Sequence, residues 1–162
     1  MLRALGRVVV NFNAVEHWLA TWTGQLIVWD PIIGEIVTAE MSFKNLLALF
    51  SSLCKYRVRD ESLLQEVKNA VALLAQAEQQ RNELVHCCWL ERKPGEPHKT
   101  RKTTAKQKKG HHTQFKDVSV QDVNALADRM RDIDYLLTLL AGKLLGWIPK
   151  EKRAEGEGAG KP

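Results

Sequence analysis

The sequence lacks the features that mark membrane-spanning and secreted proteins. It contains no apolar run that approaches the ~18 residues of a transmembrane helix. The N-terminal segment leads into only a short apolar patch with no small-residue cleavage site, so we expect no signal peptide. These absences predict a cytoplasmic protein that does not associate with a membrane.

Cysteine is also scarce, because the chain has only three: Cys54 and the adjacent pair Cys87 and Cys88. An odd number that includes a vicinal pair argues against a disulfide framework and favours a reducing compartment. Two adjacent cysteines without further ligands at a suitable spacing make a poor zinc site. We therefore expect all three to be buried or partly buried thiols.

Metal ligands are equally sparse elsewhere in the chain. His98, His111 and His112 lie close together in the sequence, but no carboxylate or cysteine stands at a spacing that would complete a site with them. The sequence therefore predicts no metal ion and no other cofactor. Any chemistry has to come from the side chains themselves.

Positive charge, by contrast, is plentiful and unevenly placed. Residues 92–116 contain nine Lys and Arg residues against the single acidic residue Glu96, whereas the whole chain carries a net charge of +5. The rest of the chain is therefore mildly acidic. A concentrated basic segment is typical of proteins that bind a polyanion. A run of lysines is also a common way to keep a surface soluble, and the sequence leaves that alternative open.

Apolar residues recur at three- and four-residue steps in four segments, which predicts four helices. The first covers about residues 2–28, and its tryptophans favour a core or subunit interface. Residues 29–34 contain Pro and Gly and are expected to end it. The second helix starts after Ser42, which is a suitable N-cap, and runs to about Tyr56.

The third predicted helix is long and has no internal Gly or Pro. It begins at Asp60 or Ser62 and reaches Arg81. Its alanine-rich middle allows close approach of another helix, either of the same chain or of another subunit. The fourth begins with a capping-box pattern at Ser119 and ends near Gly146.

Between the third and fourth helices, residues 90–118 break the helical pattern. They combine a turn signal at residues 94–97 with a basic, threonine-rich run, so we expect a loop or two short, poorly buried strands. Phe115 is the only aromatic residue of this insertion, which gives little support for stacking on unpaired bases. The chain is thus expected to be one all-α domain, residues 1–148, with a basic insertion and a disordered tail at 149–162.

The end of the third predicted helix holds Arg81, Asn82 and His86. Asn82 and His86 are four residues apart and share a face, whereas Arg81 and His86 diverge by about 140° on a regular helix. The long arginine side chain, or a helix that loosens at His86, would close that gap. The strand-like residues 87–90 favour the second. A guanidinium beside an imidazole can bind a phosphate and transfer a proton. The same spacing also arises by chance on surface helices.

A helical domain whose third helix ends in Arg81-Asn82 followed by His86 resembles the HEPN superfamily ("higher eukaryotes and prokaryotes nucleotide-binding" domains). The shared motif is Arg, often a polar residue, and His after four to six intervening residues. The resemblance implies a four-helix up-down bundle and a homodimer in which two motifs face one cleft. It also implies a metal-independent endoribonuclease of the toxin–antitoxin or phage-defence type, with an antitoxin protein as a partner.

The resemblance assigns a role to each residue of the motif. His86 would act as base or acid on the ribose 2′-OH or the leaving 5′-oxygen, and Arg81 would hold the phosphate. Asn82 would donate to a phosphate oxygen or orient His86, and Asn13 or Glu16 of the first helix would support the site. Products would carry 2′,3′-cyclic phosphate and 5′-OH ends. The cations expected to hold the RNA backbone are Lys99, Arg101, Lys102, Lys106, Lys108 and Lys109.

Two other functions fit the same sequence. The chain is expected to serve as a non-catalytic helical module if its basic segment binds nucleic acid or a partner protein and the motif is inactive. It is expected to be a structural or regulatory dimer if both the motif and the basic run are incidental. Substitution of His86 distinguishes the enzyme from the binding module, because only the enzyme needs the imidazole.

Overall fold

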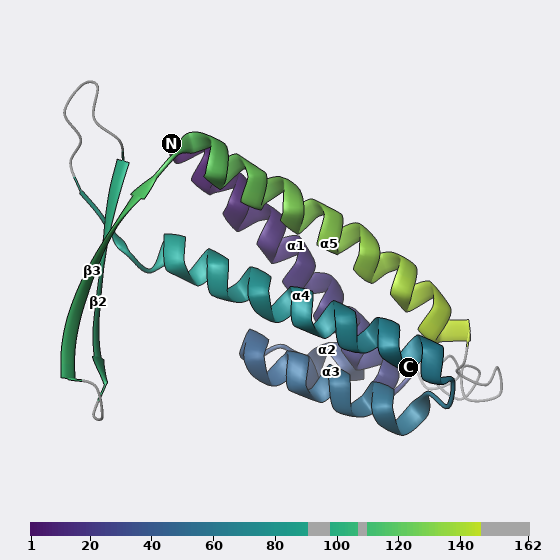
Figure 1. The fold of residues 1–162 in the computed structure, drawn as a ribbon. Helices are drawn as coiled ribbons and strands as arrows, with labels where there is room; N and C mark the ends of the chain where they lie inside the picture. Colours follow the sequence, from purple (N-terminus) through teal and green to yellow (C-terminus); the bar gives the residue numbers. More distant parts are fainter. Residues whose placement is uncertain (91–97, 107–109, 147–162) are drawn as a thin grey trace.

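The computed structural model describes residues 1–90, 98–106 and 110–146, so the predicted turn at 94–97 and tail at 149–162 lie outside it. The protein is mostly helical, with a small antiparallel sheet between the last two helices (Figure 1). The helices are α1 (Leu2–Ile27), α2 (Pro31–Thr38), α3 (Phe43–Arg57), α4 (Glu61–Val85) and α5 (Val120–Gly146). The strands are β1 (Cys88–Trp89), β2 (His98–Lys106) and β3 (Gly110–Val118).

The sequence predicts four helices, and the structure adds a fifth, α2, in a segment expected only to end α1. The Asp30 carboxylate accepts hydrogen bonds from the backbone N–H groups of Ile32 (2.9 Å) and Ile33 (3.3 Å). Pro31 stands in the first turn, where a missing N–H costs nothing because that group has no partner in the helix. The proline therefore stops one helix and starts the next.

Two glycines bring α2 against the end of α1. Gly24 and Gly34 are buried, and a Cβ atom added to either would lie 2.9 Å from the Cα of the other. Only residues without a side chain allow such an approach. The buried Thr38 hydroxyl donates to the carbonyl oxygen of Gly34 (3.0 Å). The close approach of Gly24 and Gly34 fixes the position of α2 on the bundle.

The predicted starts of α3, α4 and α5 are confirmed by their side-chain caps. The Ser42 side chain caps α3, and the Asp60 carboxylate accepts a hydrogen bond from the N–H of Leu63 (2.8 Å) at the start of α4. At the start of α5, the N–H of Asp122 donates to the Ser119 hydroxyl (3.0 Å). Each cap satisfies a backbone donor that the first turn leaves without a helical partner.

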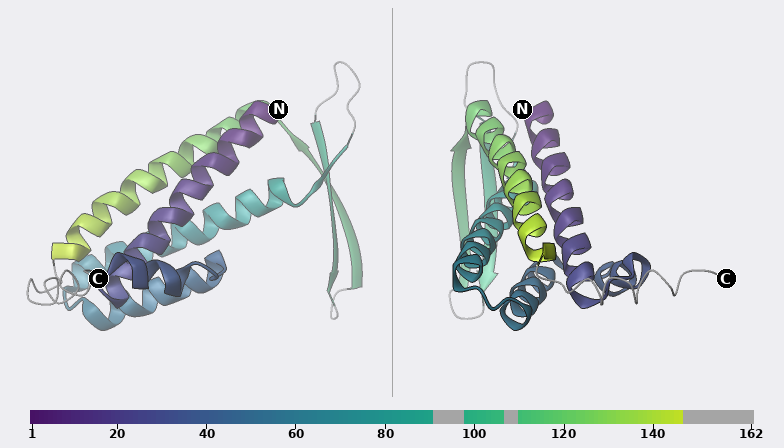
Figure 2. Two further views of the ribbon diagram at one scale, coloured as in Figure 1. Left: turned by 180° about the vertical axis from the view of Figure 1, so that it is seen from behind. Right: turned by 90° about the vertical axis from the view of Figure 1, so that its right-hand side faces the viewer.

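Helix α1 packs against all four other helices and forms the centre of the body. Arg7 donates to Asn124 (2.7 Å) and to Asp128 (2.6 Å), and the Asn11 side chain donates to the carbonyl oxygen of Ala127 (2.7 Å). These bonds hold α1 and α5 side by side, running in the same direction (Figure 2).

The largest fully buried apolar side chains come from α1, α3, α4 and α5. They are Phe12, Phe50, Leu19, Leu46, Leu74, Met130, Leu137, Val8, Val15, Val67 and Val123. Within the described ranges, no helix is both long enough and apolar enough to cross a bilayer.

The basic insertion folds into a hairpin, because β2 pairs with β3 over nine residues, and β1 pairs with β2 over two. These strands are longer than the short ones we expected. Threonine is abundant in them and favours extended backbone, and the hydroxyls of Thr103 and Thr113 meet across the ladder at 3.4 Å. The hairpin stands beyond the end of α4, and only Thr100 and Val118 of its described residues are buried (Figures 1 and 2).

Candidate functional site

The end of α4 holds the Arg81 side chain against the helical body. Its guanidinium carbon lies 4.7 Å from the ring centroid of Phe12, a fully buried residue of α1. The Arg81 Nη1 atom donates to the Asn82 side-chain oxygen at 2.7 Å. A cation over an aromatic face is attracted by the ring quadrupole. Phe12 and Asn82 therefore fix a half-buried guanidinium in one place.

This guanidinium has no acidic partner within the described part of the chain, where the ion pairs involve other side chains. Its Nε atom is buried and makes no hydrogen bond there. A partly desolvated charge without a counter-charge is costly unless something else satisfies it. An external anion with several oxygens is a suitable ligand, because the planar guanidinium binds phosphate through two parallel bonds.

His86 stands at the point where α4 stops. The helix ends at Val85, and His86 has φ −101° and ψ 15°, with its backbone N–H donating to the carbonyl oxygen of Asn82 (3.1 Å). The predicted change from helix to strand at this point is thus confirmed. The imidazole is exposed. Among the described residues, the hydrogen bond and the ring contact of Arg81 go to Asn82 and Phe12 and not to His86. Within the described residues, the structure therefore brings Arg81 together with Asn82, and the His86 ring stays exposed.

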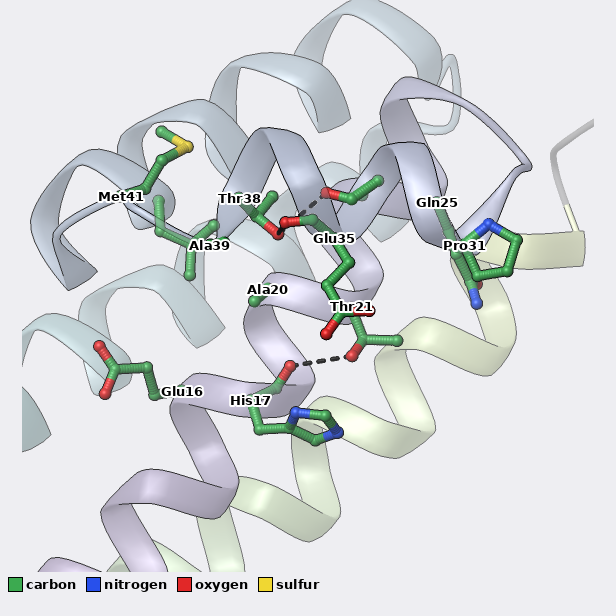
Figure 3. A pocket seen from close by; sticks show the side chains of 13 residues that line it. Glu16, His17, Ala20, Thr21, Gln25, Pro31, Glu35, Thr38, Ala39 and Met41 are labelled. Atoms are coloured by element: carbon green, nitrogen blue, oxygen red, sulfur yellow. Dashed lines mark hydrogen bonds between the residues drawn. The ribbon is translucent and has the colours of Figure 1, made fainter.

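Asn13 and Glu16, the predicted supporting residues, are not among the described contacts of Arg81. Asn13 is exposed. Glu16 lines a separate pocket of about 340 Å³ between α1 and α2 (Figure 3). The supporting role of Asn13 and Glu16 stays a prediction. The residue of α1 that contacts the Arg81 guanidinium of the same chain is Phe12. The periodicity of α1 identifies Phe12 only as a core residue, since a contact with a side chain 69 positions away leaves no local signal.

The pocket between α1 and α2 is lined by both polar and apolar residues. Gly24 and Gly34 lie among its lining residues, and Glu35 extends from α2 towards Thr21 of α1 (Figure 3). The Thr21 hydroxyl donates to the carbonyl oxygen of His17 (3.0 Å). Sequence reasoning missed this pocket because it depends on α2, which the sequence did not predict.

The predicted RNA-binding cations lie on different faces of the hairpin. Lys99 and Arg101 are exposed, whereas Lys102 is half-buried on the opposite face. Lys106 is the last residue of β2, and only its backbone position is described. The remaining two, Lys108 and Lys109, lie outside the described residues.

A second groove, of about 490 Å³, lies where the hairpin meets α4 and α5. Its charged lining is mixed, with Glu83, Asp117 and Asp122 against Lys116 and Arg129. This excess of one acidic residue does not favour a polyanion. The sequence does not predict this groove either, because the groove depends on how the hairpin lies against α4 and α5.

The three cysteines differ in exposure. Cys54 is buried in α3, and burial raises the pKa of its thiol to about 12. Cys87 is half-buried, but Cys88 is exposed, so the prediction that all three are at least partly buried is wrong for Cys88. Side chains alternate between the faces of a strand. The next residue, Trp89, packs against the helical core, so Cys88 faces away from it.

Among the described residues, no three His, Cys, Asp or Glu side chains gather closely enough to hold a metal ion. The end of α4 presents a guanidinium held on Phe12, an amide and an exposed imidazole. Together they can bind an anion and exchange a proton.

No protein-family model, curated protein or solved structure matches this chain.

Proposed function

We propose that the protein is a metal-independent endoribonuclease of the HEPN type, with Arg81, Asn82 and His86 as its site. The helical body would then be a HEPN-like bundle extended by α2 and by the hairpin. It would depart from the expected up-down order, because α1 and α5 run in the same direction. The observation that carries the proposal is the half-buried Arg81 guanidinium, which is held by Phe12 and Asn82 without an acidic partner in the described chain.

The proposed reaction needs a cation for the phosphate, a base and an acid. The ribose 2′-OH attacks the neighbouring phosphorus, its proton passes to a base, and the 5′-oxygen leaves with a proton from an acid. Arg81 stabilises the negative charge that develops on the phosphate oxygens. His86 takes or gives one of the protons, and the exposed position of its ring allows RNA to reach it. The products carry 2′,3′-cyclic phosphate and 5′-OH ends.

One chain supplies one histidine from the motif, whereas the reaction uses both a base and an acid. We therefore propose a homodimer in which the α4 ends of two copies share one cleft. The backbone N–H of His86 donates to the carbonyl oxygen of Asn82 (3.1 Å), so both residues stand at the end of α4 that the two copies would share. An antitoxin protein that covers this cleft would inhibit the enzyme.

A non-catalytic role in binding nucleic acid is the second candidate. Catalytic imidazoles are commonly oriented by a hydrogen bond to their second nitrogen. Among the described residues, the His86 ring has no such side-chain partner, and this observation favours the binding role. In that case Arg81 and the hairpin bind RNA, and the backbone is not cut.

The two candidates are separated by RNA cleavage in EDTA with purified protein. We expect the wild type to cleave, His86→Ala to lower the rate by roughly 10²–10⁴-fold, and Arg81→Lys to lower it while conserving the charge. The matched controls are His17→Ala and Arg59→Ala, which remove exposed residues outside the site. Mass spectrometry of the products should find cyclic phosphate ends. A wild type that binds RNA but never cuts it would leave the binding module as the function.

A further inference from the structure

The hairpin has two chemically different faces. Pairing places Lys99 opposite Asp117, Arg101 opposite Phe115, and Thr103 opposite Thr113, so these six side chains share one face. Every one of them except Thr113 is exposed. On the other face, Thr100, Lys102 and Thr104 of β2 are buried or half-buried, whereas their partners His112, Gln114 and Lys116 of β3 are exposed. We call the first set the outer face of the hairpin.

Phe115 is the unusual residue of the outer face. Its side chain is 61% exposed, so it does not hold the hairpin against the helical body. Arg101 lies directly opposite Phe115 on β2, and such cross-strand neighbours have Cβ atoms about 5 Å apart. The structure thus pairs an open aromatic ring with an open guanidinium, an arrangement that the sequence could not reveal without the strand register.

The charges of the outer face favour Arg101 as its anion ligand. Lys99 stands opposite Asp117 at the base of the hairpin, where the carboxylate offsets its charge. No carboxylate lies opposite Arg101, whose cross-strand neighbours are Phe115 on one side and Cys88 on the other. A phosphate bound to Arg101 would therefore lie beside the Phe115 ring.

We propose that the outer face binds an unpaired segment of RNA, with one base stacked on Phe115 and the adjoining phosphate on Arg101. An aromatic ring stacks on any exposed base, whereas a base inside a duplex is already stacked and cannot reach it. This inference rests on RNA being the substrate, as proposed above, and makes single-stranded RNA the substrate class.

The position of the outer face relative to the motif suits this role. Cys88 follows His86 by two residues and pairs with Arg101, which in turn pairs with Phe115. Adjacent strands are about 4.8 Å apart, so Phe115 lies roughly 10 Å across the sheet from Cys88. A strand of RNA held on the outer face is thereby delivered to the end of α4.

The test is fluorescence anisotropy with a short 2′-O-methyl oligouridine, either single-stranded or annealed to its complement. The 2′-O-methyl group blocks the nucleophile, so binding is measured without cleavage.

We expect Phe115→Ala to weaken single-strand binding by about tenfold and to leave duplex binding unchanged. Phe115→Trp should restore the affinity, and Arg101→Gln should weaken binding and lower its dependence on salt. Tyr56→Ala, which removes an aromatic side chain that is 77% exposed on α3, serves as the control.

The result that would overturn the inference is an unchanged single-strand affinity in Phe115→Ala, or an equal loss for single strand and duplex. Failure of the proposed enzyme looks different. In that case His86→Ala and wild type behave alike towards unmodified RNA, while the Phe115 variants still differ in affinity. If both proposals hold, Phe115→Ala raises KM but leaves the single-turnover rate at saturating RNA unchanged, whereas His86→Ala does the reverse.

Discussion

The helical body and the hairpin use similar residues for opposite purposes. In the body, Phe50 is fully buried and Cys54 is enclosed, and a glycine pair sets the distance between two helices. In the hairpin and the short strand beside it, Phe115 and Cys88 are open to solvent. The difference indicates that the body supplies the stability of the fold, whereas the hairpin keeps its side chains available for a ligand.

The candidate site lies where these two regions join. Arg81 belongs to the body, because its guanidinium packs on Phe12. His86 belongs to the junction, because it ends α4 and leads into the strand that pairs with β2. In the function proposed above, the fixed cation of the body would hold the phosphate and the exposed imidazole of the junction would transfer a proton.

The sharpest comparison is between two phenylalanines. Phe50→Ala should lower the free energy of unfolding by about 3–5 kcal/mol, because it empties a fully enclosed position. Phe115→Ala should change it by no more than about 0.5 kcal/mol, since its ring is mostly in water already. Urea unfolding followed by helical circular dichroism measures both. Similar losses in the two variants would show that the hairpin is part of the same cooperative core.

A smaller effect is expected from two glycines. Gly24→Ala places a Cβ 2.9 Å from the backbone of Gly34, so we expect α1 and α2 to move apart at a cost of about 1–3 kcal/mol. Gly110→Ala meets no atom within 4 Å but has φ +67°, where a side chain costs roughly 1–2 kcal/mol. Urea unfolding should detect the first, and hydrogen exchange of the strand amides the second.

Gly6→Ala is the control for the helix itself. Gly6 lies in α1, and a Cβ atom added there would meet no other atom within 4 Å, so alanine should raise stability by about 0.5–1 kcal/mol. A loss of stability at Gly6 equal to that at Gly24 would contradict the steric explanation. It would point instead to a general intolerance of α1 to substitution.

Much of the helical body could be predicted from the sequence, because its signals are local. Apolar spacing and the caps at Ser42 and Asp60 identify where α3 and α4 lie. Helix α2 could not be predicted in this way, because Pro31 and Gly34 resemble signals that end a helix. Their actual roles depend on Asp30 as a cap and on a glycine partner in α1.

The candidate site could be predicted only in part, and for the same reason. The spacing of Arg81, Asn82 and His86 is a local pattern and is visible in the sequence. The contact of Arg81 with Phe12 and the pairing of Arg101 with Phe115 are not local. The second depends on strand register, which a run of lysines and threonines without apolar alternation does not specify.

The last comparison sets the buried cysteine of the body against the exposed cysteine beside the hairpin, through the pH dependence of stability. Burial raises the pKa of the Cys54 thiol from 9.0 to about 12. The contribution of the buried, protonated thiol to the free energy of unfolding is therefore fully present below pH 9 and is lost as pH rises towards 12. In that range the unfolded thiol ionises and the folded one does not, so protons leave the unfolded state first. At pH 10 the wild type should have lost roughly 1 kcal/mol for this reason relative to pH 8. Urea unfolding at the two pH values should show a smaller loss in Cys54→Ala and the wild-type loss in Cys88→Ala, whose thiol is exposed. Equal pH dependence in all three proteins would mean that Cys54 reaches water in the folded state, and the enclosure of α3 within the body would then be wrong.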